Sequence, residues 1–486
     1  MEQDNELIRI RYEKLNELVK QGVDPYNQKF EVTHTSTEVF ENYEELKDAV
    51  VAVAGRIISI REHGKACFGH LQDGKGNIQF YLNVDGIGPE LFEQFKLCDI
   101  GDIIGVKGKV FCTRRGEITI QAQEYFVLAK SLRPLPEKWH GLKDVELRYR
   151  QRYLDLIVNK EVKETFILRS KIIQGIRDIL NERDFLEVET PMMSTIAGGA
   201  SARPFRTYHN ALDVNLFLRI ATELHLKRLL VGEMEKVYEL GKVFRNEGIS
   251  TIHNPEFTSL EIYQTYADYH DMMELTEQLI SELCRRLFGE KKIEYEGKVF
   301  DLTPPWPRVS MLELVKDYTG VDFNSFEDNQ RAHKEAEFLG LETDKNDKWG
   351  NILTNAFETF CEDKLEQPIF VKDFPVEVSP LAKTKREDPR FTERFEAFVG
   401  GKEIANAFSE LNDPLEQRKR FEYQLTLRQK GDEEAHMMDE DFLTSLEYGM
   451  PPAGGLGIGV DRLVMFLCGE TSIRDVILFP TLKPRD

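Results

Sequence analysis

The chain has 486 residues and a formal net charge of -21 at pH 7, a length that predicts about three domains. Hydrophobic residues make up 41% of the sequence and aromatic residues 10%, which indicates a globular protein with a substantial core. The negative charge argues against a protein that coats DNA or RNA nonspecifically, although a local basic patch can still bind RNA. No apolar run approaches the roughly 20 residues that span a bilayer, so we expect no membrane partner.

The first 25 residues predict one amphipathic helix. This segment has the features of neither a signal peptide nor a transit peptide, so we expect a cytoplasmic protein. The six cysteines form no CxxC pair, which predicts isolated buried thiols instead of zinc ligands or disulfides. They are Cys67, Cys98, Cys112, Cys284, Cys361 and Cys468.

Residues 50–132 contain five short runs with strand-like alternation, separated by turn signals. A helical segment follows the third run. Five strands with a helix in this position predict an OB-fold barrel, a module that often binds oligonucleotides. The same pattern also fits a small barrel without a nucleic-acid role. Phe68 is either a platform for an unpaired base or part of the core.

A proline-bearing linker is followed by Arg- and Lys-rich helices and then by mixed antiparallel strands and helices. This order indicates an α+β domain. We predict an N-terminal helical extension over residues 1–44, the OB-fold barrel over 45–132, a linker over 133–145 and a catalytic domain over 146–486. Mostly helical sequence over about 267–366 predicts an insertion in that domain.

The stretch VFRNEGISTIHNPEFTSLEIY, residues 243–263, predicts a strand, an irregular loop and a returning strand. Arg245 and Glu247 stand two residues apart, so on a strand both side chains leave the same face. Because buried charges need a partner or a ligand, this pattern favours a substrate-binding floor, and Arg245 favours an anionic group. The returning strand repeats the alternation at Phe257, Ser259, Glu261 and Tyr263.

The stretch GGLGIGVDRLVMFLCG, residues 454–469, places four glycines before an apolar helix with Arg462 in its first turn. Glycines let a backbone approach a flat ring or a phosphate closely. Close packing of the helix on a sheet explains the glycines but not the arginine. Arg462 stands where a dinucleotide-binding fingerprint needs its third glycine, so that interpretation is poor.

The stretch RFEAFVGGKEIANAFSELND, residues 394–413, predicts a hairpin that turns at its two glycines. In that register Phe398 faces Glu403 and Glu396 faces Ala405, so the two glutamates become diagonal neighbours on one face. Such a pair either binds a hard cation, for which Mg²⁺ is the expected ion, or is simply solvated.

Asn406, Phe408 and Glu410 have the opposite parity to the two glutamates on this strand. A β-bulge between Glu403 and Asn406 is required if all five side chains line one pocket. Two further segments are ambiguous. Glu223 begins a predicted helix, where the helix dipole favours a carboxylate, and the glycine-rich loop over 195–205 either is flexible or admits a ligand.

These motifs resemble those of a known family. FLEVETP, VFRNEG with HNPEFTSLEIY, and GLGIGVDR resemble motifs 1, 2 and 3 of class II aminoacyl-tRNA synthetases. The preceding OB-like domain resembles the lysine, aspartate and asparagine subgroup, and HGLKDVELRYRQRYLDLI, AGGASARPF, VSPLAK and GGKEIANAFSELND resemble its lysine enzymes. The resemblance covers the chain from about residue 42. It implies an OB-fold anticodon-binding barrel and a class II catalytic domain built on an antiparallel sheet flanked by helices.

The resemblance also implies a reaction: ATP-dependent attachment of L-lysine to tRNA(Lys). Lysyl-adenylate forms first with release of pyrophosphate, and the terminal ribose of the tRNA then accepts the lysine. The lysine carboxylate is already ionised at neutral pH, so positioning and charge neutralisation by arginines and Mg²⁺ carry catalysis. A homodimer is expected from the resemblance alone.

The family roles transfer by position to the ATP site. Arg245 would clamp the α-phosphate and the reacting carboxylate, and Arg462 would hold the γ-phosphate; these two are the predicted catalytic residues. Phe257 would stack on adenine, and Glu396 and Glu403 would bind Mg²⁺. The other predicted ATP-binding residues are Glu247, His253, Asn254, Glu396 and Gly459.

The same transfer gives a lysine site. Gly199 and Glu223 would receive the α-amino end, and Tyr263 and Glu410 the side-chain ammonium. A cationic side chain in a pocket needs a desolvated carboxylate, which Glu410 supplies, whereas an aspartate enzyme would need an arginine there. The other predicted lysine-binding residues are Glu261, Asn406 and Phe408.

In the OB domain Phe68 would stack on an anticodon base, and Gln79 and Glu117 would read uracil edges. The alternatives are a sibling enzyme for asparagine or aspartate, a non-catalytic synthetase-like RNA-binding or regulatory protein, and lysylation of a protein instead of tRNA. Three positions depart from the family's common residues. They are Ile252 for arginine, Thr222 for proline and Ala407 for glycine.

Overall fold

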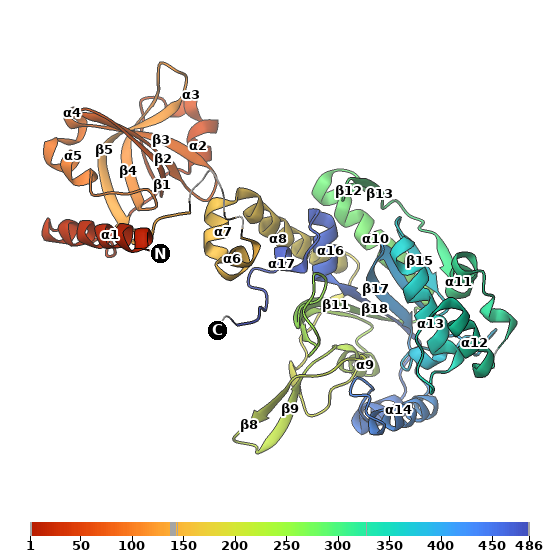
Figure 1. The fold of residues 1–486 in the computed structure, drawn as a ribbon. Helices are drawn as coiled ribbons and strands as arrows, with labels where there is room; N and C mark the ends of the chain where they lie inside the picture. Colours follow the sequence, from red (N-terminus) through yellow and green to blue (C-terminus); the bar gives the residue numbers. More distant parts are fainter. Residues whose placement is uncertain (1, 137–141, 143, 327, 485–486) are drawn as a thin grey trace. The chain divides into compact units, whose positions relative to one another are not determined.

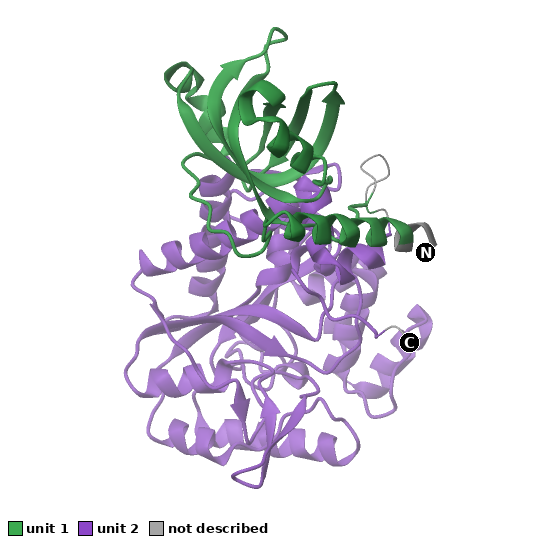
Figure 2. Cartoon of the chain, turned by 90° about the vertical axis from the view of Figure 1, so that its left-hand side faces the viewer, with its two compact units in different colours: residues 1–143 green, residues 144–486 purple. Residues whose placement is uncertain are grey.

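The computed structural model describes residues 2–136, 142, 144–326 and 328–484. It divides into two compact units, residues 1–143 and 144–486 (Figure 2). Within the predicted linker, residues 137–141 and 143 lie outside the described residues. The finer domain boundaries stay predictions.

The first unit is a closed barrel with one longer helix at its start and four short helices among its described residues, two before the first strand and two after the third (Figure 1). Strand order around the barrel is β1-β2-β3-β5-β4, which confirms the predicted five-stranded barrel with a helix after the third strand. Its elements are α1 (Glu2–Lys20), α2 (Ser36–Glu41), α3 (Tyr43–Leu46), β1 (Val50–His63), β2 (Ala66–Gln72), β3 (Asn77–Asn83), α4 (Val84–Ile87), α5 (Pro89–Phe95), β4 (Ile103–Cys112) and β5 (Ile118–Ala129).

The alternation in β2 illustrates why these residues form a barrel. Cys67, Gly69 and Leu71 are buried, whereas Phe68 and His70 between them are only partly buried. Successive side chains of a strand point to opposite faces, so β2 turns its apolar set inward and leaves Phe68 and His70 on the outer surface.

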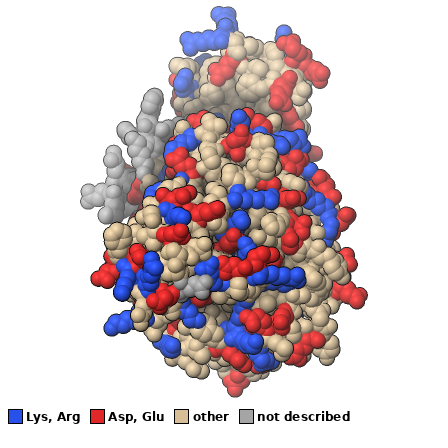
Figure 3. Space-filling model, turned by 90° about the vertical axis from the view of Figure 1, so that its right-hand side faces the viewer, with Lys and Arg blue, Asp and Glu red and all other residues tan. Residues whose placement is uncertain are grey.

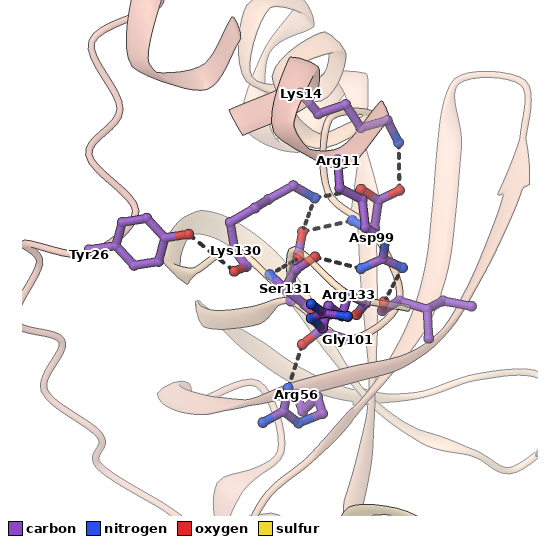
Figure 4. A network of polar contacts seen from close by, with 11 residues as sticks. Arg11, Lys14, Tyr26, Arg56, Asp99, Gly101, Lys130, Ser131 and Arg133 are labelled. Carbon is purple, nitrogen blue, oxygen red and sulfur yellow. Dashed lines mark hydrogen bonds and ion pairs between the residues drawn. The ribbon is translucent and has the colours of Figure 1, made fainter. Parts of the chain in front are cut away.

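A polar network fastens α1 to the barrel (Figure 4). Arg11 donates to the carbonyls of Ser131 at 2.7 Å and Ile100 at 2.9 Å. Lys14 and Lys130 both contact Asp99, at 2.6 and 2.5 Å. Lys130 is fully buried and also reaches Asp102 at 2.8 Å, so this buried ammonium bridges two carboxylates.

The second unit is built on an eight-stranded sheet in the order β14-β15-β16-β17-β18-β11-β10-β6. The pairs β14–β15 and β10–β6 are parallel and the others antiparallel, which confirms the α+β class. The sheet strands are β6 (Leu186–Glu187), β10 (Lys236–Phe244), β11 (Glu256–Thr265), β14 (Arg308–Ser310), β15 (Ile369–Lys372), β16 (Arg394–Val399), β17 (Lys402–Ser409) and β18 (Ala453–Gly459).

Helices cover both faces of this sheet, with α8, α10 and α16 on one side and α9 and α14 on the other (Figure 1). The helices of the unit are α6 (Val145–Arg150), α7 (Arg152–Val158), α8 (Lys160–Asn181), α9 (Glu223–Val231), α10 (Tyr269–Phe288), α11 (Met311–Thr319), α12 (Asn329–Leu339), α13 (Trp349–Phe360), α14 (Pro414–Gln429), α15 (Glu440–Glu447), α16 (Val460–Cys468) and α17 (Ile473–Val476). Small side sheets contain β7 (Met193–Ser194), β8 (Arg206–His209) and β9 (Val214–Leu218), and β12 (Lys292–Tyr295) with β13 (Lys298–Asp301).

The pleat of β11 separates core from site. Leu260 and Ile262 are fully buried in the core beneath α8, α10 and α16. Ser259, Glu261 and Tyr263 alternate with them and therefore point to the opposite face, where they line a cavity.

The predicted insertion over 267–366 is only in part an addition to the fold. Its first helix, α10, begins at a capping box formed by Asp268 and Asp271 and ends at Gly289, whose φ is 82°. This helix belongs to the main core, and β14 pairs with β15 of the main sheet. Helices α11, α12 and α13 form a separate apolar cluster.

The prediction of buried cysteines is wrong at two positions. Cys67, Cys98, Cys284 and Cys361 are buried, but Cys112 at the end of β4 is exposed and Cys468 is half-buried. Cys112 is the last residue of β4, where the side chains of the strand are no longer covered by the core. Among the described residues, no helix is long and apolar enough to cross a membrane.

Candidate active site

A cavity of about 660 Å³ opens on the sheet face opposite α8, α10 and α16. Every predicted ATP-, lysine- and metal-binding residue except Glu410 lines it, although these residues come from five separate stretches of the chain. They are Gly199, Glu223, Arg245, Glu247, His253, Asn254, Phe257, Glu261, Tyr263, Glu396, Glu403, Asn406, Phe408, Gly459 and Arg462.

The prediction that Arg245 and Glu247 lie on a strand is wrong. Strand β10 ends at Phe244, and the chain leaves the ladder because the Asn246 N–H donates to the carbonyl of Arg203 at 2.7 Å. The loop nevertheless keeps both side chains at the cavity.

Among the described residues, the guanidinium of Arg245 has no carboxylate partner. In the part of the chain that the structure describes, it forms no salt bridge, and its buried Nε has no hydrogen-bond partner. The guanidinium lies 5.2 Å from the centre of the Phe257 ring. An arginine that lines a cavity, with a buried Nε and no carboxylate partner, favours an anionic ligand.

His253 and Asn254 have protein partners. His253 Nδ1 lies 3.0 Å from Ser250 Oγ, and Arg462 Nη2 lies 3.3 Å from His253 Nε2. Burial and the nearby Arg462 lower the pKa of His253, so its ring is neutral. The Asn254 amide donates to the carbonyl of Glu256 at 2.6 Å and accepts from the Thr481 N–H at 3.2 Å. These bonds hold the loop in shape.

The hairpin of β16 and β17 contains the predicted bulge. Phe398 pairs with Glu403 as expected, but Glu396 pairs with Asn406 and not with Ala405. The register shifts because Ile404 is an extra residue on β17. Glu396, Glu403 and Asn406 therefore all line the same cavity.

The two hairpin glutamates lie beside arginines. Glu396 contacts Arg394 at 2.6 Å, and Glu403 contacts Arg462 at 3.1 Å. Burial and the neighbouring Glu403 raise the pKa of Glu396 to about 8. A bound cation would offset both effects, and carboxylates are the ligands that Mg²⁺ prefers. The described residues contain no group of three or more metal-ligating side chains, so other ligands would come from phosphates and water.

Glu261 and Tyr263 form the polar floor next to α9. Glu261 accepts from the Thr222 N–H at 3.0 Å and from the Tyr263 hydroxyl at 3.4 Å. Burial raises the pKa of Glu261 to about 7. The carboxyl is therefore ready to lose a proton when a cation arrives.

Glu410 lies behind the cavity wall and not on it. It is fully buried, and burial raises its pKa while the Lys227 ammonium opposes that rise. Lys227 contacts Glu410 Oε2 and, at 2.5 Å, Glu223 Oε1. A Cβ added to Gly455 would fall 1.9 Å from Glu410 Oε1 and 2.6 Å from the Tyr263 ring. The glycine therefore leaves room for the carboxylate at the wall.

The candidate tRNA surface lies on the outer face of the barrel. Phe68 stacks near Tyr81 with ring centres 4.6 Å apart, and Tyr81 lies 6.3 Å from Phe111. Gln79 donates to Glu117 at 2.7 Å. Phe68 and Glu117 thus reach the outer surface, and Gln79, which is buried, is bonded to Glu117 beneath it. Aromatic and hydrogen-bonding groups are the composition of a single-strand binding platform.

Sequence reasoning missed several residues of both sites. Lys227 is four residues after Glu223 on α9, and this i, i+4 spacing of opposite charges was a readable signal. Arg394 stood two residues before Glu396, on the same strand face. Tyr81 becomes a neighbour of Phe68, and Phe111 a neighbour of Tyr81, only through strand pairing.

Comparison with known proteins agrees with this fold and site. Residues 144–483 match the family of class II tRNA synthetases for D, K and N, and residues 51–128 match an OB-fold nucleic acid binding domain. The fold and the cavity thus define a class II synthetase with an anticodon-type OB domain.

The curated relatives are full-length matches. Lysine–tRNA ligase of Moorella thermoacetica is 59% identical over 486 residues, covering 100% of this chain and 99% of that protein. The lysine–tRNA ligase of Pelotomaculum thermopropionicum is 61% identical over 484 residues, covering 99% and 96%, and that of Carboxydothermus hydrogenoformans is 59% identical over 482 residues, covering 99% of each. The chain belongs to the lysine–tRNA ligase family of class II synthetases.

Proposed function

We propose that this enzyme activates L-lysine with ATP in the cavity of the second unit and transfers it to tRNA(Lys). The proposal rests on one observation: the cavity contains two separate regions of opposite charge. An arginine without a protein anion lies at one part, and a floor of buried carboxylates lies at the other. An anionic nucleotide and a substrate with two ammonium groups fit these two regions.

At the ATP end, Arg245 receives the α-phosphate and the lysine carboxylate, so that the two reacting groups are held close although both are anionic. Phe257 stacks on adenine, and Arg462 receives the γ-phosphate. Glu247, His253, Asn254 and Gly459 shape this end of the cavity. The ionised lysine carboxylate attacks the α-phosphate and pyrophosphate leaves, so the step needs positioning and charge neutralisation, not a strong base.

At the lysine end, Gly199 and Glu223 receive the α-amino group. Glu410 and Tyr263 receive the side-chain ammonium, and Asn406, Phe408 and Glu261 complete the walls. Glu396 and Glu403 would hold Mg²⁺, which when bound neutralises phosphate charge. These two residues come from adjacent strands, where Glu403 pairs with Phe398, two residues from Glu396.

The outer face of the barrel binds the anticodon through Phe68, Gln79 and Glu117. The enzyme acts in the cytoplasm as a homodimer. Sedimentation equilibrium tests the oligomeric state, and a monomer at micromolar concentration would contradict that part of the proposal.

The primary test is ATP–pyrophosphate exchange with each amino acid in turn. We expect exchange with lysine and none with aspartate or asparagine. Exchange with a sibling amino acid, or with none, contradicts the proposal. Charging of tRNA(Lys) with radiolabelled lysine then separates a tRNA ligase from an enzyme that lysylates a protein.

The substitution Glu410→Gln tests the lysine end. It removes one buried charge but keeps the shape of the side chain, so the KM for lysine should rise by about 10- to 100-fold, the range for a lost charged hydrogen bond of about 1.5–3 kcal/mol. The KM for ATP should change little. Equal losses for both substrates would mean that Glu410 is not the partner of the ammonium.

A further inference from the structure

Lys227 is a fully buried lysine that the proposed reaction does not use. Its Nζ contacts Glu223 Oε1 at 2.5 Å and Glu410 Oε2, and none of the three side chains is more than 8% exposed. Lys227 therefore bridges the two carboxylates that we assign to the two ends of the substrate. An ammonium is costly to bury, so this position needs a physical reason.

The charges at this end of the cavity balance only when the substrate is counted. Glu223, Glu261 and Glu410 are buried carboxylates, and Lys227 is the ammonium that contacts two of them. Burial raises the pKa of all three carboxyls, so the unfilled site favours protonated forms. When all three are ionised, three negative charges and one positive charge leave two negative charges. Lysine brings two ammonium groups, one on the α-carbon and one on the side chain.

The other charged or titratable groups that face this cluster do not alter the balance. Arg394 is paired with Glu396, and Arg245 lies at the nucleotide end. Burial lowers the pKa of His436 to about 4 and raises that of Tyr263, so both are neutral near pH 7.

Lys227 contacts one oxygen of each carboxylate, so the other oxygen remains for a ligand. Neither oxygen of Glu410 makes a hydrogen bond among the described residues, and Oε2 is the one that forms the ion pair with Lys227. The other oxygen, Oε1, lies beside Gly455 and Tyr263, because a Cβ added to Gly455 would fall 1.9 Å from this oxygen. Gly455 and Tyr263 both line the cavity. Glu223 is bound to Lys227 through Oε1 alone and lines the cavity itself.

We propose that Lys227 is a positioning residue for amino-acid specificity, which keeps Glu223 and Glu410 ionised and oriented so that each offers one oxygen to an ammonium group of lysine. The proposal rests on the proposed activation of lysine at this cavity and adds a residue to it. Without Lys227, three buried carboxylates would face one another, and at least one would take up a proton. A neutral Glu410 would no longer select a charged side chain.

The test compares Lys227→Met with Lys130→Met in the full-length enzyme by ATP–pyrophosphate exchange. Lys130 is a matched control because it is also fully buried and bridges two carboxylates, but in the first unit (Figure 4). We expect Lys227→Met to raise the KM for lysine by about ten-fold or more, with the KM for ATP within about two-fold. Lys130→Met should change neither.

A second readout measures specificity directly. Norleucine lacks the side-chain ammonium, so its inhibition constant relative to the KM for lysine reports how strongly the pocket selects a charge. This ratio should fall by about ten-fold in Lys227→Met. A purely structural role would weaken both ligands equally and leave the ratio unchanged, which would overturn the proposal.

Chemical rescue supplies a third readout. Lys227→Ala removes the equivalent of n-propylamine, so added n-propylammonium should lower the KM for lysine again, whereas 1-propanol should not. The wild-type enzyme shows whether propylammonium itself competes with lysine. Equal effects of amine and alcohol would contradict the proposal.

If Lys227→Met does not fold, Lys227→Arg replaces it. The guanidinium keeps the charge but has a planar, wider geometry, so the proposal expects a raised KM for lysine in a folded protein, and an unchanged KM would overturn it. Failure of the proposed function looks different, because the wild-type enzyme itself would then show no exchange with lysine.

Discussion

Single residues of the lysine end illustrate how burial sets chemistry. Thr222 stands where proline is common in the family, and its N–H donates to Glu261 at 3.0 Å. Proline has no N–H, so this departure adds a hydrogen bond to the floor. Ala407 is fully buried and Ile252 packs beside the main core. The structure therefore accommodates all three departures.

Glu261 predicts a pH dependence of lysine binding. Burial raises its pKa to about 7 from an ordinary value of 4.5, and the ammonium groups of lysine favour the ionised form. The KM for lysine should therefore fall as pH rises from about 6 to about 8, and Glu261→Gln should flatten that profile in exchange assays. A profile that stays unchanged in the variant would exclude Glu261 as the titrating group.

The same shift has a consequence for stability. Because the folded-state pKa of Glu261 lies above the unfolded value, its stabilising contribution is full below about pH 4.5 and is lost as pH rises through about 7. Lysine should restore stability most at the upper end of this window. Thermal unfolding with and without lysine measures the difference.

Gly455 predicts a steric test of the wall in front of Glu410. In Gly455→Ala the new Cβ would fall 1.9 Å from Glu410 Oε1 and 2.6 Å from the Tyr263 ring, so at least one of them must move. We expect a raised KM for lysine and a nearly unchanged KM for ATP. Unchanged kinetics for both substrates would show that neither side chain needs its present position.

The geometry of the strands determines which of these side chains lie on the same face of the sheet. The bulge at Ile404 turns Glu403 and Asn406 to the same side, and the pleat of β11 turns Glu261 to the cavity and Leu260 to the core. In the barrel, Gln123 is an extra residue on β5 opposite Lys107 and Gly108 of β4, which makes a bulge in β5.

Gly108 of β4, opposite the bulge in β5, predicts a variant that separates the two activities. A Cβ on Gly108 would fall 2.0 Å from the backbone oxygen of Gln121, so Gly108→Ala should destabilise the barrel by about 1–3 kcal/mol. Charging of tRNA should fall while exchange with lysine continues, because the cavity lies in the other unit. Calorimetry and the two assays check this, and equal loss of both activities would contradict the separation.

The whole molecule combines two units with different tasks on an acidic chain. On the face drawn in Figure 3, Lys and Arg side chains are interspersed with Asp and Glu. With a net charge of -21, nonspecific attraction to RNA is weak. We therefore propose that recognition of the tRNA depends on local contacts, such as those predicted on the outer face of the barrel.

Phe68 predicts the strength of that local contact. Stacking on a base is worth about 1–3 kcal/mol, so Phe68→Ala should raise the KM for tRNA by about 5- to 150-fold without changing exchange with lysine. Phe338→Ala is a control of the same chemistry, since Phe338 is 79% exposed on α12. A Phe68→Ala enzyme that charges tRNA normally would remove Phe68 from the anticodon site.

Local sequence patterns predicted most of the strands that form the barrel and the floor of the cavity. Alternation predicted the barrel strands and β11, because side-chain direction in a strand depends only on sequence parity. The same argument required a bulge in β17 before Asn406, which is present. It failed at Arg245 and Glu247, where a hydrogen bond from Asn246 to Arg203, more than 40 positions earlier in the chain, ends the strand.

The amino-acid sequence by itself determined the two-part organisation, through local periodicity, and the family motifs, through residue types at fixed spacing. The resemblance carried by those motifs then identified fifteen of the residues that line the cavity. Only the tertiary structure decided which charges are paired. Arg245 is left without a carboxylate and Lys227 joins Glu223 to Glu410 because distant elements converge and bury these groups together. Burial depends on several segments at once, and it strengthens the interaction of these charges with one another and with a ligand.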